Sequence, residues 1–221
     1  MLDPQSFDLA RLFNDGPEMF DSRDTFRAAG FEVFSRSHDS QDKIMVGRHQ
    51  SVEGCLFKKY SNKISKISLD DQLANYECRI EGASRLRTFI SEHHLRHIAV
   101  PQKWLYEIPT PSPHISRISY ILVVEELKLL DKKKTERAYR HIDKSVLREL
   151  CLVLFHFRGL DSITKNMPFT KDGRVAFIDT EHWRRHDRLK KEGKKILSHI
   201  DSHLSDKRRK LAKKLIKELE G

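Results

Sequence analysis

Apolar and polar residues alternate with a period of two along the stretch that follows the first thirty residues, and this pattern predicts β-strands. The expected strands cover residues 31–34, 44–47 and 55–60, and they would pair in a small antiparallel sheet. In the third strand Leu56 and Lys58 share one face. Phe57 and Lys59 share the opposite face. If Leu56 faces a pocket, Lys58 faces it as well.

The first thirty residues are predicted to form two short helices, separated by a turn-forming segment at residues 14–17. The apolar positions expected to be buried there are Leu9, Leu12, Phe13, Phe20 and Phe26. These positions indicate packing against the rest of the fold, with no recognisable chemistry.

A helical period begins at Ser68, where a capping hydroxyl is followed by two carboxylates at the positive end of the helix dipole. The helix is predicted to run to about His93. Its apolar face should contain Leu69, Leu73, Tyr76, Ile80, Ala83 and Ile90, with Gln72 and Arg79 on or beside it. Glu77 lies nearer the edge of this face than Glu81, and either Glu could pair with Lys58.

A near-continuous apolar run at residues 119–127 predicts a strand that ends in carboxylates. The charged segment DKKKTERAYRH, residues 131–141, predicts an exposed linker or a polar helix and marks a natural domain boundary. An amphipathic helix is then expected over residues 143–158. Its predicted core positions are Val146, Leu147, Leu150, Val153 and Leu154.

Residues 159–183 combine a tight hairpin with three oxygen-bearing side chains at fixed spacing. Strand, turn and strand are predicted over residues 167–169, 171–173 and 174–178. Asn166 precedes this hairpin and Asp179 follows it, so two oxygen ligands of the kind that Mg²⁺ prefers flank it. Asp161, five residues before Asn166, could supply the carboxylate that phosphoryl transfer needs near an attacking hydroxyl.

With 221 residues, of which 38% are hydrophobic and 33% charged, the chain fits a soluble protein with one good core or two small ones. Its apolar runs are too short to cross a bilayer, and its amino terminus lacks the order of a secretory signal. We therefore expect no transmembrane segment and a cytoplasmic location. The three widely spaced cysteines favour a reducing compartment over disulfides or a zinc site.

The net charge of +10 is concentrated in the tail, because residues 182–221 hold fourteen Lys and Arg against six Asp and Glu. The tail is helical by pattern. An acidic protein is a candidate partner for it, although a charge run of this kind is more often the solvated face of a helix. Nucleic acid ranks lower, since the tail matches no recognition motif and has few interleaved aromatic residues.

Together these features resemble a protein kinase or a kinase-like phosphotransferase, from about residue 31 to residue 183. The resemblance implies an α+β fold of the bilobal protein-kinase-like kind, with a small antiparallel β-sheet in the amino-terminal lobe and a truncated helical carboxy-terminal lobe. We expect a helical extension at residues 1–30 and a kinase-like amino-terminal lobe at residues 31–127. A reduced carboxy-terminal lobe, with the catalytic loop and the basic tail, would occupy residues 128–221.

The resemblance also implies that the cofactors are ATP and Mg²⁺ and assigns the nucleotide contacts. Lys58, in GCLFKKY, would match the third-strand lysine that holds the α- and β-phosphates. Glu77 would match its partner on the helix. Glu125 to Leu127 would match the hinge, whose backbone meets adenine.

On the catalytic side, Asp161 would match the catalytic-loop base, while Asn166 and Asp179 would match the two metal ligands. The sequence departs from the family in several places, and no APE-type motif and only about forty residues follow Asp179, too few for a full carboxy-terminal lobe. The connection SRSHDSQD has no glycine, Gly159 and Leu160 stand where His and Arg normally precede the base, and Thr180–Glu181 replaces Phe-Gly. With its truncated carboxy-terminal lobe, the chain is similar to small-molecule phosphotransferases or to compact bacterial effector kinases. An effector of this kind would be delivered into another cell.

Three functions follow from these features. The first is an ATP- and Mg²⁺-dependent phosphotransferase whose acceptor, a protein or a small molecule, is unknown. The second, favoured by the glycine-free connection, is a pseudokinase or scaffold module that binds a partner without turnover. The third and weakest is nucleotidyl transfer, in which a kinase-like site donates AMP.

Overall fold

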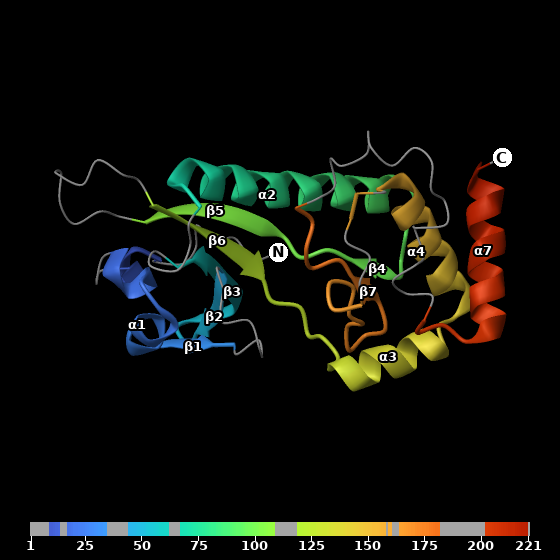
Figure 1. Ribbon diagram of the computed structural model, residues 1–221, viewed down its shortest axis with the longest axis horizontal. Coiled ribbons are helices and arrows are strands. Elements are labelled where there is room, and N and C mark those ends of the chain that lie inside the picture. The colour runs from blue at the N-terminus through green and yellow to red at the C-terminus, as the bar shows by residue number, and fades with distance from the viewer. Residues whose placement is uncertain are drawn as a thin grey trace. The chain divides into compact units, whose positions relative to one another are not determined.

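The computed structural model describes residues 9–13, 17–34, 44–61, 67–108, 119–157, 159–160, 164–181 and 202–220. This part of the chain is an α+β fold with a five-stranded antiparallel sheet, a short parallel strand pair and several helices (Figure 1). In chain order its elements are the 3₁₀ helices η2 (Leu9–Phe13) and η3 (Pro17–Phe20), then α1 (Arg23–Ala28), β1 (Phe31–Val33), β2 (Ile44–His49), β3 (Val52–Tyr60), α2 (Leu69–Glu92), β4 (Ile98–Ala99), β5 (Lys103–Ile108), β6 (Ser119–Glu125), α3 (Lys132–Arg140), α4 (Lys144–His156), β7 (Val175–Ala176) and α7 (Asp206–Glu220).

The chain divides into two compact units. The first consists of residues 1–80 and 102–126, and the second of residues 81–101 and 127–221. In this division the first thirty residues are grouped with the five-stranded sheet, and residues 81–101 are grouped with the carboxy-terminal half of the chain.

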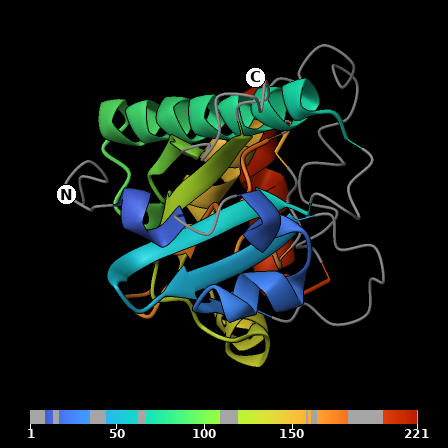
Figure 2. The same cartoon turned by 90° about the vertical axis from the view of Figure 1, so that its left-hand side faces the viewer.

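The sheet of the first unit has the strand order β1–β2–β3–β6–β5, and every neighbouring pair is antiparallel. The small antiparallel sheet predicted from the alternating pattern is therefore confirmed, and β6 and β5 extend it beyond β3. In Figure 2 the strands β2 and β3 lie in front, with the amino-terminal helices beside them.

Aromatic rings from the amino-terminal helices pack into a core with residues of this sheet. Phe26 stacks on Phe31 with ring centroids 4.1 Å apart, and Phe31 meets Phe57 edge-on at 5.4 Å. Phe13 contacts the same two sheet residues. Each aromatic pair adds roughly 0.5–1.5 kcal/mol beyond the burial of its surface. The apolar positions predicted to be buried in this region are buried, except Leu12, which is half-buried.

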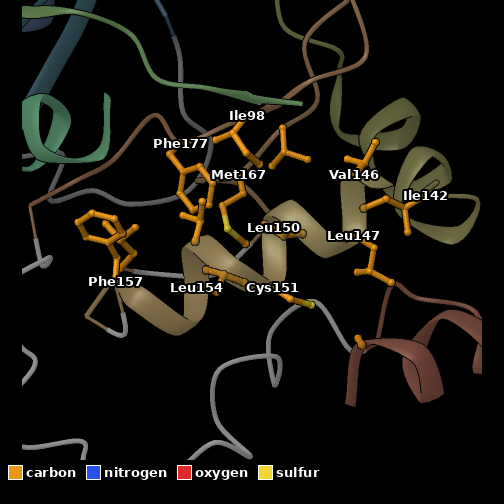
Figure 3. Close-up of a cluster of buried hydrophobic side chains, with 14 of the residues drawn as sticks. Ile98, Ile142, Val146, Leu147, Leu150, Cys151, Leu154, Phe157, Met167 and Phe177 are labelled. Atoms are coloured by element: carbon orange, nitrogen blue, oxygen red, sulfur yellow. The ribbon is translucent and has the colours of Figure 1, made fainter. Parts of the chain in front are cut away.

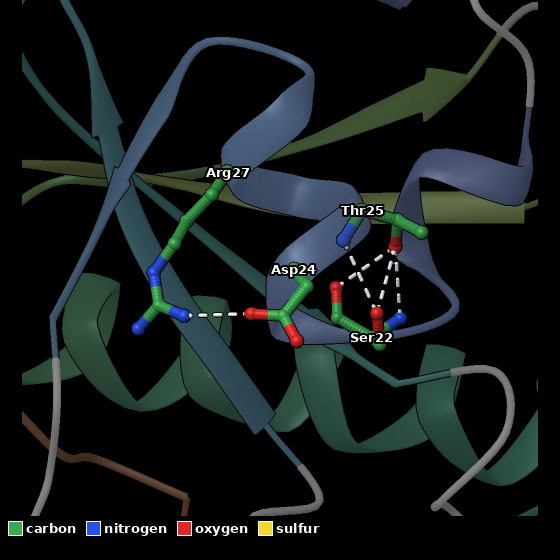
Figure 4. A network of polar contacts seen from close by, with 4 residues as sticks. All are labelled: Ser22, Asp24, Thr25 and Arg27. Atoms are coloured by element: carbon green, nitrogen blue, oxygen red, sulfur yellow. Dashed lines mark hydrogen bonds and ion pairs between the residues drawn. The ribbon is translucent and has the colours of Figure 1, made fainter.

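A capping box starts α1 (Figure 4). The Thr25 amide donates to Ser22 Oγ at 3.1 Å, and the Ser22 amide donates to Thr25 Oγ1 at 3.0 Å. Asp24 and Arg27 form an exposed ion pair at 2.9 Å. A helix of six residues is too short to be stable alone, so the cap and the buried Phe26 hold it in place.

The start of α2 is as predicted, because Ser68 Oγ accepts a hydrogen bond from the Asp71 amide at 3.1 Å. The predicted apolar face is displaced. The residues of α2 that are buried are Gln72, Tyr76, Arg79, Gly82, Ala83, Leu86 and Phe89, whereas Leu69 and Leu73 are half-buried. Gln and Arg can be buried here because their apolar stems pack while their polar ends find hydrogen-bond partners.

The core of the second unit is built around α4 (Figure 3). Leu150 and Leu154 lie beside Met167 and Phe177 there, and all five core positions predicted for this helix are buried. The helix α7 packs against α4 through its buried residues Ala212, Leu215 and Ile216. The charged segment before α4 forms the helix α3, capped by Asp131, which resolves the choice between linker and helix.

Lys59 is fully buried in the first unit, which is rare for an ammonium group. Its Nζ donates to Gln72 Oε1 at 3.2 Å and lies 5.8 Å from the centroid of the Phe20 ring. Burial lowers the pKa of Lys59 to about 8. Below that pH the folded protein therefore retains a charge in an apolar environment, which destabilises it.

We predict that replacing this amine changes how stability depends on pH. Between about pH 8 and the unfolded-state pKa near 10.4, the unfolded chain binds one more proton at Lys59 than the folded protein does, so the free energy of unfolding rises with pH there. From pH 7.5 to 9.5 the wild type should gain about 2 kcal/mol of stability relative to Lys59→Met. Urea denaturation at both pH values measures this difference.

The difference between the two proteins isolates Lys59, because buried thiols and phenols with raised pKa values, such as Cys151 and Tyr139, are common to both. Lys133→Met, at an exposed position, is the matched control and should show no such trend. A constant difference across this pH range for Lys59→Met would show that the buried amine does not titrate there.

Candidate functional site

The predicted hairpin between Asn166 and Asp179 is present in the second unit. Its two sides are joined by hydrogen bonds from the Ala176 amide to the Pro168 carbonyl, and from the Ile178 amide to the Asn166 carbonyl, at 2.8 and 3.1 Å. The second of these bonds ties the residue before Asp179 to Asn166. The two predicted metal ligands are therefore brought to the same end of one hairpin, although twelve residues separate them in the sequence.

The turn of this hairpin is held by its own side chains. Gly173 has φ of +87°, and Thr170 and Arg174 close the turn through a backbone bond of 2.8 Å. Asp172 accepts hydrogen bonds from the Thr170 hydroxyl and from Arg174 Nε, the latter at 3.0 Å, and it forms an ion pair with Arg174 Nη2 at 2.7 Å. Arg174 first and Thr170 second lower the pKa of Asp172 to about 2. The turn is therefore fixed independently of the residues at the open end.

At the open end, Asn166 is buried and Asp179 is half-buried. The Oδ1 atom of Asp179 is itself buried and accepts no hydrogen bond within the described part of the chain. An amide oxygen and a carboxylate oxygen are hard ligands that suit Mg²⁺, which commonly takes one or two protein ligands and completes its shell with water and phosphate oxygens. The donor set at this end of the hairpin thus fits Mg²⁺.

Three segments of the second unit hold the hairpin. The strands β4 and β7 pair in parallel, with Ile98 opposite Val175. The Tyr139 hydroxyl of α3 donates to the Met167 carbonyl at 2.7 Å, and the Leu130 amide donates to the Phe169 carbonyl at 2.7 Å. Tyr139 is fully buried, and burial raises the pKa of its phenol.

The support of the hairpin by α3 was not predicted, because this segment is dominated by charged residues. A signal was nevertheless present: Thr135 and Tyr139, four residues apart, are two of the three uncharged residues in KKKTERAYR. Both are buried, and Thr135 Oγ1 accepts a hydrogen bond from the Phe169 amide at 3.4 Å.

Lys58 lies in β3 of the first unit, opposite Val46 of β2 and Leu122 of β6. It is almost fully buried. The predicted alternation is correct, since Leu56 packs with one apolar cluster and Phe57 belongs to another. Lys58 is therefore on the Leu56 face of the strand.

The helical residues considered as partners of Lys58 are placed differently from one another. Glu77 is exposed on α2, and the buried residue two positions further on is Arg79. Glu81 forms an ion pair with Arg85 at 2.9 Å. Exposure of Glu77 follows from the displaced apolar face of α2, and its pairing with Lys58 stays a prediction.

The predicted hinge begins at the end of β6. The Glu125 amide donates to the Gln102 carbonyl at 2.9 Å, and Glu125 Oε2 accepts from the Gln102 amide at 3.0 Å. The Glu126 amide donates to the Gly54 carbonyl at 2.7 Å. These two backbone donors are thus engaged within the first unit, and Leu127, which is half-buried, begins the second.

Asp161, the predicted catalytic base, lies outside the described residues, as do the connection at residues 35–43 and residues 182–201 of the basic tail. Among the residues that the structure describes, no group of three or more His, Cys, Asp or Glu side chains is arranged to hold a metal ion. None of the described helices is long and apolar enough to span a membrane.

Comparison of the sequence with known proteins assigns it to no family. No protein-family model matches the sequence, and no curated protein is significantly similar to it.

We predict that Gly173→Ala destabilises the hairpin through the backbone alone. A Cβ at this position would have no heavy atom within 4 Å, so no steric clash contributes. The left-handed conformation should cost an alanine roughly 1 kcal/mol, and an asparagine less, because Asn tolerates that conformation better. Urea denaturation of both variants measures these losses. Equal stability of Gly173→Ala and the wild type would contradict the positive φ.

Proposed function

We propose that this chain is an ATP- and Mg²⁺-dependent, kinase-like phosphotransferase. The observation that carries the proposal is the backbone pairing of Asn166 with Ile178 across the hairpin, which brings Asn166 and Asp179 to the same end of it. Phosphoryl transfer depends mainly on positioning and on charge neutralisation at the phosphates, so a pair of hard oxygen ligands on a well-supported hairpin suits it.

The order of elements supports the proposal. A small antiparallel sheet carries Lys58 on its third strand, a long helix follows, and an apolar strand then leads to Glu125 and Leu127. This is the order implied by the resemblance to protein kinases, and the finer proposal of a bilobal kinase-like fold rests on it.

Each residue has a defined role in this proposal. Asn166 and Asp179 would hold Mg²⁺, which neutralises charge on the phosphates when bound. Lys58 would contact the α- and β-phosphates as a point charge. Asp161 would orient the acceptor hydroxyl and accept its proton. Glu125 to Leu127 would contact adenine, with Leu127 the better candidate for an amide donor because the amides of Glu125 and Glu126 are engaged in the sheet.

Glu77 would enter this site only as the partner of Lys58. Because Glu77 is exposed, an ion pair between Lys58 and Glu77 would be well solvated. Its contribution to the binding free energy should therefore be small.

The first test removes a metal ligand. Asp179→Ala should lower ATP-dependent phosphate transfer by at least a thousandfold, since loss of charge neutralisation at the phosphates costs several kcal/mol in the barrier. It should also weaken Mn²⁺ binding in the presence of nucleotide. Turnover and Mn²⁺ affinity are measured on the same preparations.

The matched control is Asp172→Asn, which changes an exposed carboxylate of the same hairpin that lies at the turn, away from Asn166. It should leave turnover and Mn²⁺ affinity within about threefold of the wild type. Any small loss would come from loosening of the turn. Undiminished phosphate transfer by Asp179→Ala would sink the metal-ligand assignment, and mass spectrometry of the product would separate phosphate transfer from AMP transfer.

A pseudokinase or scaffold module is the second candidate, and the glycine-free connection SRSHDSQD favours it. Glycine allows backbone amides to approach phosphates closely, so its absence predicts weak nucleotide binding.

A thermal shift measurement separates the two candidates. If ATP and Mg²⁺ bind, nucleotide at 100 times its Kd stabilises the folded protein by about 2.7 kcal/mol. For a chain of this size, that corresponds to a rise in Tm of roughly 5–10 °C. Lys58→Met should reduce the rise, whereas Lys133→Met, an exposed lysine, should not. The module is favoured if millimolar nucleotide leaves Tm unchanged in the wild type.

A further inference from the structure

A carboxylate on α4 holds the segment that leads into β4. Glu149 Oε2 accepts a hydrogen bond from the His97 amide at 2.7 Å, and Glu149 Oε1 lies 2.8 Å from His97 Nδ1. The Glu149 side chain is only 17% exposed and belongs to a helix whose neighbouring residues Leu150 and Cys151 are in the core. A carboxylate in such surroundings is costly unless both oxygens are satisfied, and here one residue engages both.

From His97 a short series of backbone hydrogen bonds leads to the candidate metal site. The His97 carbonyl accepts from the Val175 amide, and the Ala99 carbonyl accepts from the Phe177 amide, each at 2.8 Å. The next residue, Ile178, donates to the Asn166 carbonyl at 3.1 Å. Three hydrogen bonds joined by short stretches of backbone therefore connect Glu149 to Asn166 within the second unit: Glu149 to His97, Ala99 to Phe177, and Ile178 to Asn166.

The strands on this path are too short to define their own alignment. β4 and β7 pair over two residues each, and a two-stranded ladder of this length is marginal in water. A shift of one residue in such a ladder turns every side chain to the opposite face. A fixed point outside the ladder is therefore needed, and the two-point contact between Glu149 and His97 provides one at the residue that precedes β4.

We propose that Glu149 and His97 form a positioning pair for the hairpin, setting the alignment of residues 97–99 against residues 175–177 and thereby the placement of Asn166 and Asp179. The metal-related part of this proposal rests on the proposed phosphotransferase function. The alignment part does not, and it can be measured by itself. Neither residue touches the metal in this proposal, since both act through the backbone of the hairpin.

The test compares Glu149→Leu with two conservative variants. Glu149→Leu removes both hydrogen bonds at similar volume. Glu149→Gln keeps an acceptor for the His97 amide, and His97→Asn keeps an N–H donor near the position of Nδ1. Ile216→Ala, in the buried face of α7, is the control for a general loss of stability in the same unit.

Two measurements are made under conditions where every variant is folded. Mn²⁺ affinity in the presence of ATP should fall about tenfold in Glu149→Leu, the size expected when a group supporting metal ligands is lost. It should stay within threefold in Glu149→Gln, His97→Asn and Ile216→Ala. Amide hydrogen exchange at Val175 and Phe177 should become at least tenfold faster in Glu149→Leu alone.

The proposal is overturned if Glu149→Leu matches the wild type in hydrogen exchange, or if Ile216→Ala accelerates exchange at these two amides equally. Wild-type protein that binds no Mn²⁺ with ATP would instead contradict the proposed function. In that case the exchange measurements still decide whether Glu149 and His97 align the hairpin. Normal Mn²⁺ affinity in Glu149→Leu with accelerated exchange would also overturn the link to the metal site.

Discussion

The candidate site depends on the backbone pairing between residues 97–99 and residues 175–177. More than seventy residues separate these segments, so the pairing closes a long loop, which costs conformational entropy before any contact compensates it. The contacts that offset this cost lie around it: the core of α4, the buried Tyr139 and the carboxylate of Glu149. The placement of Asn166 and Asp179 at one end of the hairpin is consequently a product of the folded second unit and not of the hairpin alone.

The sequence predicted the local features of this fold well, because each follows from residues close together. Alternation identified β3 and the opposite faces of Leu56 and Phe57, and Ser68 marked the start of α2. The hairpin was predictable because Gly173 and the short apolar runs on either side of it specify a turn. The placement of Asn166 and Asp179 at the same end of the hairpin followed from that turn.

What could not be predicted depends on partners distant in the sequence. Gln72 and Arg79 were expected on or beside the apolar face of α2, but the shift of the buried face toward them, away from Leu69 and Leu73, was not, because it depends on partners such as Lys59 in another element. The choice between linker and helix at α3 was undecidable because the hydroxyl of Tyr139 finds its acceptor 28 residues away. The pairing of β4 with β7 was missed because two-residue strands carry no recognisable period.

The adjacent lysines of β3 show how one strand gives identical side chains different chemistry. Lys59 is buried, with its Nζ near the Phe20 ring and bonded to Gln72, whereas Lys58 is on the face shared with Leu56. Because neighbouring residues of a strand alternate, inserting or deleting one residue earlier in β3 would exchange the two amines between the faces. This strand should therefore tolerate substitutions that preserve its alternating pattern but not a change in its length.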